Sequence, residues 1–236
     1  MPSEQIQYEG KDLESMSFAQ NYHRWIVSIF RKYLGKRVAE VGAGSGNFSS
    51  LLASENIQEL VAIEPSQEMF PLLREKFRNT PRVVCAQALF ADIYTHYTEH
   101  FDSIVYVNVL EHIEHDAIEL YYVHQSLKQG GYVCIFVPAL PWLYSVFDAS
   151  LGHYRRYEKK QLEKLLENAG FVIVKISFFD FFGIIPWFVA CTLFRRKLSA
   201  GNTAAYDTIV VPFSRAFEFL IPVPLGKNLI AVGKKK

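Results

Sequence analysis

The chain has 236 residues, enough for one domain with a full hydrophobic core, or for one domain that carries a sizeable insertion. Its 25 lysines and arginines nearly balance its 24 aspartates and glutamates, and a formal net charge of +1 argues against a nucleic-acid partner. Residues 1–15 are polar and lack the layout of a secretory signal, so we expect a cytoplasmic protein.

The predicted elements alternate between helices and strands along most of the chain. Apolar residues recur at helical spacing from Phe18 to Leu34, and a strand is predicted at Arg37–Val41. Further strands are predicted at 59–63, 82–86, 103–107, 132–137, 171–177 and 228–232, with helices from about Ser66, at 116–127 and at 158–169. This alternation predicts a parallel sheet covered on both faces.

Roughly fifty residues separate the last two predicted strands, too many for an ordinary connection. We therefore expect one domain formed by residues 1–178 and 226–236, interrupted by an apolar helical insertion at residues 179–225. The run from Phe181 to Phe194 is shorter than the roughly twenty residues that a spanning helix needs. Trp187 and the basic residues after the run suit a segment lying in a bilayer surface, namely Arg195, Arg196 and Lys197. A lid on the sheet and a homodimer contact are the alternatives.

Cysteine and histidine give no recognisable metal site in the sequence. Cys85, Cys134 and Cys191 lie in apolar stretches without a C-x-x-C spacing, and we interpret them as buried thiols. The histidines have no cysteine or carboxylate partner at a typical spacing. We therefore expect no metal.

A glycine-rich turn follows the first predicted strand, in the stretch V-A-E-V-G-A-G-S-G. Glycine lets the main chain approach a ligand closely and adopt a positive φ, so the turn predicts a binding site. The dinucleotide fingerprint G-x-G-x-x-G/A would have a small third residue where this chain has Asn47, which weakens a nicotinamide interpretation. Glu64 ends the next strand and suits the two ribose hydroxyls of an adenosine-bearing ligand.

Four segments in order resemble class I S-adenosylmethionine-dependent methyltransferases. E-V-G-A-G-S-G is similar to the family's first motif, V-A-I-E-P-S to its second strand, F-D-S-I-V-Y-V-N-V-L-E-H-I to its fourth, and L-K-Q-G-G-Y-V-C-I-F-V-P to its fifth. The match is closest to the small-molecule branch, of the methyltransferase type 11/12 kind. The resemblance implies a Rossmann-like, doubly wound, seven-stranded sheet, mostly parallel with one antiparallel strand, and S-adenosyl-L-methionine as cofactor.

The resemblance also implies roles for particular residues around that cofactor. The turn glycines would approach the methionine and ribose portions, with Glu40 beneath them near the ligand ammonium; the glycines are Gly42, Gly44 and Gly46. Glu64 would hold the ribose and Asn108 would line the methionine side. Gln87 or Asp92 would contact the adenine amine, where the family often has aspartate.

The helix before the first strand would cover the cofactor in the same way. Arg24 would then pair with the methionine carboxylate. The alternative is that Trp25 belongs to the core and Arg24 is a solvated helix charge.

Two histidines are candidates for the base that an oxygen acceptor of high pKa requires. His112 comes one turn after Asn108, where a helix-start histidine bonded to the backbone is the alternative. His153 lies in L-G-H-Y-R-R-Y, after the fifth strand. Arg155 and Arg156 would fork onto an anionic acceptor beside Tyr154, or would anchor this loop to the following helix.

These observations favour an enzyme that methylates a hydroxyl, carboxylate or similar group of a small or lipid-linked metabolite. A nucleotide-dependent oxidoreductase on a related fold is one alternative, and a non-catalytic adenosylmethionine-binding or membrane-associated scaffold is another. The apolar insertion adds a peripheral contact with the inner face of the membrane, or a homodimer, to the expected partners.

Overall fold

The computed structural model describes residues 19–194 and 200–236, and its centre is a seven-stranded sheet. The strand order is β3-β2-β1-β4-β5-β7-β6. The strands are β1 (Arg37–Val41), β2 (Glu59–Ile63), β3 (Val83–Ala86), β4 (Phe101–Val107), β5 (Leu127–Pro138), β6 (Phe171–Phe179) and β7 (Asn228–Lys235). Neighbours from β3 to β5 pair in parallel, whereas β7 runs antiparallel to both β5 and β6. The doubly wound sheet with one antiparallel strand is therefore confirmed.

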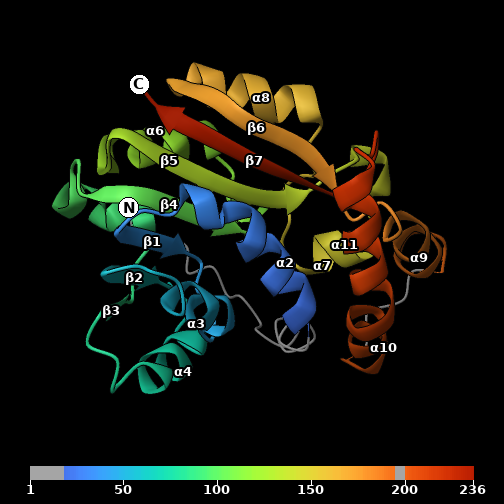
Figure 1. Ribbon diagram of the computed structural model, residues 1–236, viewed down its shortest axis with the longest axis horizontal. Helices are drawn as coiled ribbons and strands as arrows, with labels where there is room; N and C mark the ends of the chain where they lie inside the picture. Colours follow the sequence, from blue (N-terminus) through green and yellow to red (C-terminus); the bar gives the residue numbers. More distant parts are fainter. Residues whose placement is uncertain (1–18, 195–199) are drawn as a thin grey trace.

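Alternate residues of the strands build two separate hydrophobic cores. In β1, Val38 contributes to the core that contains α2 (Gln20–Phe30), α3 (Asn47–Ala53) and α4 (Met69–Lys76). Ala39 and Val41 contribute to the opposite core, with α6 (Asp116–Ser126) and α8 (Lys159–Asn168). Figure 1 shows α2, α3 and α4 on the near face of the sheet and α6 on the far face. A strand buried on both faces needs apolar residues at nearly every position, which is why β1 and β2 are mainly apolar, with Glu40 as the buried exception.

Several boundaries differ from the sequence prediction for identifiable reasons. Phe18 lies outside the described residues, and the first helix changes to a 3-10 turn at Arg31–Tyr33. The helix expected from Ser66 begins at Met69, because the Ser66 hydroxyl accepts hydrogen bonds from the Glu68 and Met69 amides in a preceding turn. β5 begins at Leu127 because this residue already pairs with Phe101 of β4. Short helical segments not predicted are α5 (Phe90–Ile93) and α7 (Val146–Ser150), with 3-10 turns at Tyr94–Tyr97, Leu110–His112 and Pro141–Leu143.

The described part of the expected insertion is largely helical, although Phe179 is still the last residue of β6 and the residues just before α9 and after α11 are not helical. It contains α9 (Ile184–Trp187), a π-helical segment (Phe188–Leu193), α10 (Ala200–Ala205), a second π-helical segment (Tyr206–Val210) and α11 (Val211–Leu220). In Figure 1 these helices lie at the end of the molecule where β5 and β6 terminate, next to α7. The basic residues that suggested a membrane contact, Arg195, Arg196 and Lys197, lie outside the described residues.

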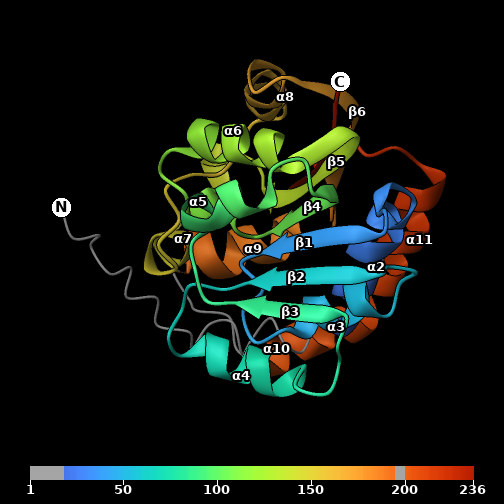
Figure 2. The same cartoon turned by 90° about the vertical axis from the view of Figure 1, so that its left-hand side faces the viewer.

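The parallel strands bring their carboxyl ends to one edge of the sheet. Figure 2 shows the arrowheads of β1, β2 and β3 pointing the same way. Ligands of open α/β sheets bind in the crevice outside these ends, where the strand order reverses. Here the strand order reverses between β1 and β4, so the candidate site lies at the carboxyl ends of these two strands.

Candidate functional site

The glycine turn between β1 and α3 has the backbone geometry that the sequence predicted. Gly42, Gly44 and Gly46 have φ values of 74°, 56° and 82°, in the left-handed region that favours glycine. A Cβ on Gly42 would collide with the Val109 side chain, which follows β4. The turn therefore packs tightly against the loop that follows β4.

Glu64 holds this turn from the end of β2. Its carboxylate accepts a 2.7 Å hydrogen bond from the Gly44 amide and a 2.8 Å bond from the Ser66 amide. Burial raises the pKa of Glu64, and these two amide hydrogen bonds counteract the increase. Each carboxylate oxygen has two lone pairs, so a hydroxyl donor from a ligand can share the group with the backbone.

Glu40 is the penultimate residue of β1, two positions before Gly42. Its side chain is buried, and Oε2 has no hydrogen-bond partner in the structure. Burial raises the Glu40 pKa to about 8, with the nearby Glu64 charge adding to the increase. A buried polar oxygen without a partner is unfavourable. A positively charged donor from a ligand would satisfy it.

The remaining residues predicted to hold the cofactor lie at different depths. Asn108 ends β4 with φ at 54°, and its amide donates to the Phe136 carbonyl. Gln87 is exposed just beyond β3. Trp25 belongs to the core, whereas Arg24 is exposed and directs its guanidinium toward Gln20 of the same helix. This arrangement matches the solvated-charge alternative stated for Arg24.

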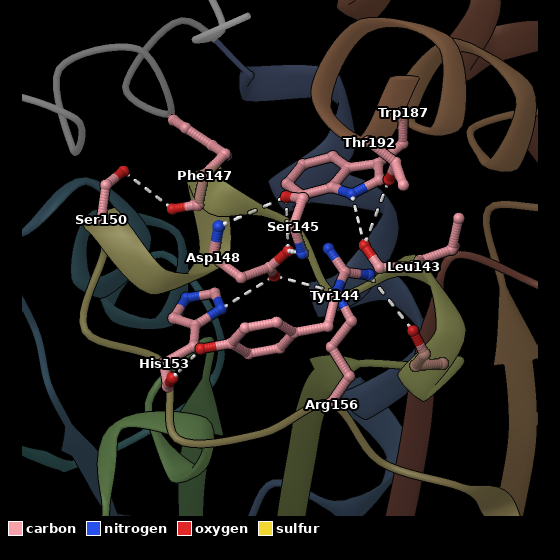
Figure 3. A network of polar contacts seen from close by, with 11 residues as sticks. Leu143, Tyr144, Ser145, Phe147, Asp148, Ser150, His153, Arg156, Trp187 and Thr192 are labelled. Atoms are coloured by element: carbon pink, nitrogen blue, oxygen red, sulfur yellow. Dashed lines mark hydrogen bonds and ion pairs between the residues drawn. The ribbon is translucent and has the colours of Figure 1, made fainter. Parts of the chain in front are cut away.

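The loop after β5 contains a buried polar network built around Asp148 (Figure 3). Asp148 sits at N3 of α7 and forms a capping box with Ser145. The same carboxylate accepts a 2.8 Å bond from Arg156 Nε and lies 3.1 Å from His153 Nδ1. Burial raises the Asp148 pKa, but the His153 hydrogen bond and the Arg156 charge outweigh it and lower the pKa overall. An ionised carboxylate only accepts, so Nδ1 of His153 is the donor, which leaves Nε2 as the basic nitrogen.

His112 lies edge-on against the His153 ring, with 4.6 Å between the ring centroids. Burial lowers the His112 pKa to about 3. The neighbouring His153 lowers this pKa further, whereas a backbone hydrogen bond with Gly152 partly opposes the decrease. His112 is therefore a neutral imidazole at physiological pH. The hydrogen bond with the Gly152 backbone is the contact expected if His112 is a structural histidine and not the base.

Both arginines of the H-Y-R-R-Y segment contact protein acceptors. Arg155 donates to Asp116 Oδ2 at 2.8 Å and to the Glu114 carbonyl at 2.7 Å. Arg156 is 3% exposed and adds a bond to the Ala139 carbonyl. Tyr154 is exposed. These arginine contacts are those of the alternative in which the segment anchors the loop.

The sequence analysis missed Asp148 and Glu111 as parts of this site. Asp148 precedes His153 by five residues, and a carboxylate at that distance in a loop gives no periodic signal. Glu111 is next to His112, is fully buried, and both of its carboxylate oxygens lack a hydrogen-bond partner. Glu111 comes four residues after β4, in a 3-10 turn, so it lacks the signal of a charge directly after a strand that identified Glu64.

The insertion is fixed to the sheet domain by buried carboxylates. Asp207 accepts hydrogen bonds from the Asn21 and Tyr22 amides at the start of α2. Asp180 accepts from the hydroxyl groups of Tyr22 and Tyr206, and it pairs with Lys227 at 3.0 Å. Trp187 donates from its indole nitrogen to the Leu143 carbonyl, near α7. These contacts pack the insertion against the start of α2 and against the segment before α7.

No helix in the described part of the chain combines the length and apolarity needed to cross a membrane.

A family model described as a methyltransferase domain matches residues 17–176. No curated protein sequence matches the chain. Among solved structures, an S-adenosylmethionine-dependent methyltransferase from Archaeoglobus fulgidus is 18% identical with a TM-score of 0.62, over 97% of this chain and 98% of that one. A methyltransferase from Haloferax volcanii, solved with the activator Trm112, is 16% identical with a TM-score of 0.64, over 96% and 95%.

A third similar structure contains the ligand that the sequence resemblance implies. Phosphoethanolamine N-methyltransferase 2 from Haemonchus contortus, in complex with S-adenosyl-L-methionine, is 17% identical with a TM-score of 0.61. The match covers 94% of this chain and 57% of that protein. At these identities the structural likeness shows the fold.

Proposed function

The chain belongs to the methyltransferase-domain family, and from this premise we propose that it methylates a hydroxyl, carboxylate or similar group of a small or lipid-linked metabolite. The cofactor is S-adenosylmethionine, which supplies a methyl group already activated on a sulfonium sulfur. The observation that carries the proposal is the convergence of two buried carboxylates, Glu40 and Glu64, on a glycine turn with positive φ.

The residues present fit this cofactor. The unpartnered Oε2 of Glu40 offers an acceptor for the ligand ammonium, and Glu64 retains lone pairs for the ribose hydroxyls. Asn108 would line the methionine side from just after β4, and Gln87 or Asp92 would contact the adenine amine. Arg24 would need to leave Gln20 to reach the methionine carboxylate.

Methyl transfer requires an acceptor aligned behind the methyl group and protected from water. When the acceptor oxygen attacks, a carbon–oxygen bond forms while the carbon–sulfur bond breaks, and its electrons stay on sulfur. His153 is the proposed base, because its hydrogen bond from Nδ1 to Asp148 fixes the ring and leaves Nε2 to accept the acceptor's proton. His112 packs edge-on against that ring.

Replacement of Glu64 should weaken the cofactor and its demethylated product by a similar factor, because both share the adenosyl part. A hydrogen bond to a charged acceptor contributes about 1.5–3 kcal/mol. We therefore expect Glu64→Gln to raise both dissociation constants by about 10–100-fold, as measured by isothermal titration calorimetry. The exposed neighbour Glu68→Gln is the matched control, and unchanged affinity in the Glu64 variant would remove this residue from the site.

Two other functions make different predictions in the same calorimeter. A nucleotide-dependent oxidoreductase would bind a nicotinamide cofactor and not S-adenosylmethionine. A non-catalytic scaffold would bind S-adenosylmethionine but release no S-adenosylhomocysteine with any acceptor. A screen of acceptors therefore follows the binding test.

The outer face of the insertion supports a lipid-linked acceptor or a peripheral membrane contact. It exposes large apolar side chains that a monomer seldom leaves uncovered, namely Ile185, Leu193, Ile209, Phe213, Phe219 and Leu220. Trp187 is half-buried over Arg156, so it is a poor reporter of membrane contact. Trp142 is exposed beside Phe188, so its fluorescence is the better reporter of membrane contact.

We expect the protein to float with anionic liposomes at low salt and to dissociate as salt rises. The three basic residues at 195–197 should contribute roughly 1 kcal/mol each on an anionic surface. Phe219→Glu should reduce flotation, whereas Leu72→Glu on α4, an exposed apolar residue of the sheet domain, should not. Absence of flotation at low salt, with unshifted Trp142 emission, would favour the lid or homodimer.

A further inference from the structure

Three side chains with metal-ligating atoms meet where the loops after β4 and β5 touch. Glu111 and His112 belong to the 3-10 turn after β4, and His153 belongs to the loop after α7. One ligating atom from each lies within 4.8 Å of the others. The Tyr154 amide donates to the Glu111 carbonyl at 2.9 Å and holds the two loops together.

Glu111 is the feature that requires a partner. Its side chain is fully buried, and neither carboxylate oxygen has a hydrogen-bond partner. Arg156 does not supply one, because its guanidinium bonds to Asp148 and to the Ala139 carbonyl. Leaving a buried carboxylate unpaired is among the costlier arrangements in a protein interior, and a cation beside it would remove that cost.

Both histidines already have the second interaction that a metal-ligating imidazole uses. Such a histidine binds the metal through one ring nitrogen and hydrogen-bonds through the other to a carboxylate or backbone carbonyl. Asp148 accepts from His153 Nδ1, and His112 makes a hydrogen bond with the Gly152 backbone. The carboxylate–histidine pair seen in Figure 3 occupies Nδ1 of His153 and leaves Nε2 as its metal-ligating nitrogen.

We propose that Glu111, His112 and His153 bind one divalent transition-metal ion of the zinc type. Two imidazoles and one carboxylate, with a fourth position open, form the ligand set of catalytic zinc sites, and imidazole favours such ions over Mg²⁺. Zinc holds its ligands at about 2.0–2.2 Å, and atoms within 4.8 Å of one another are near enough for side-chain rotations to bring them to that distance from one ion. The sequence analysis expected no metal because Glu111 was not recognised as a ligand.

The role of this metal site rests on the proposed function. An acceptor hydroxyl in the open position would lose its proton to solvent because the cation lowers its pKa. His153 would then act as a ligand and not as the base, while the attack on the methyl carbon stays the same.

Metal binding is measured on the chain itself, without an acceptor. After dialysis against a chelator, Zn²⁺ titration by calorimetry should give one site per chain, and Co²⁺ should produce visible absorption bands. Glu111→Gln and His153→Gln should each weaken Zn²⁺ at least tenfold, whereas the exposed-histidine control His96→Gln should bind like the wild type. Mg²⁺ should give little heat.

Two results would overturn the metal site: no Zn²⁺ heat and no Co²⁺ bands in the wild type, or variants that bind Zn²⁺ as the wild type does. S-adenosylmethionine titration of the same samples separates this outcome from failure of the proposed function. Cofactor binding without metal binding removes only the metal. Metal binding without cofactor binding contradicts the methyltransferase proposal.

Discussion

Replacement of His153 by glutamine is expected to lower the rate of methyl transfer by about 10²–10⁴-fold. Glutamine keeps the size and polarity of the side chain but neither accepts a proton at neutral pH nor replaces an imidazole ligand. The same direction is expected whether Nε2 removes the acceptor proton or binds a cation. The measurement is the initial rate of S-adenosylhomocysteine formation with free and lipid-linked acceptors that carry a hydroxyl or carboxylate.

Three variants separate a role in the reaction from a role in folding. His115→Gln removes an exposed histidine of the loop after β4 and should leave the rate unchanged. Asp148→Asn should lose part of the rate, because the ring of His153 loses its orienting carboxylate. His153→Gln should bind S-adenosylmethionine like the wild type. Loss of cofactor binding in that variant would assign the loop to structure, and an undiminished rate would exclude His153 from the reaction.

The parts of the fold that were predictable from sequence are those that local pattern determines. β1 and β2 are short apolar runs buried on both faces, and their predicted bounds agree with the structure. The glycine turn was predictable because its positive φ values exclude most other residues. Glu64 was recognisable because a charged residue directly after a buried strand lies at the edge where ligands bind.

Contacts between distant segments left no such pattern. Asp207 accepts a hydrogen bond from the Tyr22 amide at the start of α2, although the two residues are 185 positions apart. Nothing in the sequence near either residue predicts that bond. The apolar composition of the insertion indicated that something must cover it. The anchoring carboxylates Asp180 and Asp207 appear in the sequence as isolated acids among aromatic residues, so the packing against α2 was not predictable.

The acceptor side was less predictable for the same reason. His153 was a candidate from its place after the fifth strand, but its partner Asp148 lies in a short helix that was not predicted. The sequence did not distinguish between two roles for Arg156, binding an anionic acceptor or anchoring the loop, because an arginine pair is compatible with both. Burial decides between them, and burial depends on the whole fold.

Arg156→Met is expected to lower the free energy of unfolding by about 3–5 kcal/mol. The Arg156 and Asp148 side chains are 1% and 0% exposed, and removing the guanidinium leaves a buried carboxylate with only Ser145 and His153 as partners. Methionine keeps an apolar side chain beside Trp187, so the loss reports the guanidinium group: its ion pair, its hydrogen bond to the Ala139 carbonyl and its cation–π contact. Urea unfolding followed by circular dichroism measures it, with an unchanged m value expected.

The neighbouring Arg155→Met is the matched control for this ion pair. Arg155 pairs with Asp116 at 26% and 12% exposure, where solvent weakens the interaction, so a loss of about 1 kcal/mol or less is expected. Because the Asp148 pKa is lowered in the folded state, its stabilisation is present above the ordinary aspartate pKa of about 3.9 and disappears as pH falls through the folded pKa. The difference in the free energy of unfolding between the wild type and Arg156→Met should therefore become smaller at acid pH. Equal, small losses in both variants would mean that Arg156 does not anchor the loop, and would return its guanidinium to the candidates for binding an anionic acceptor.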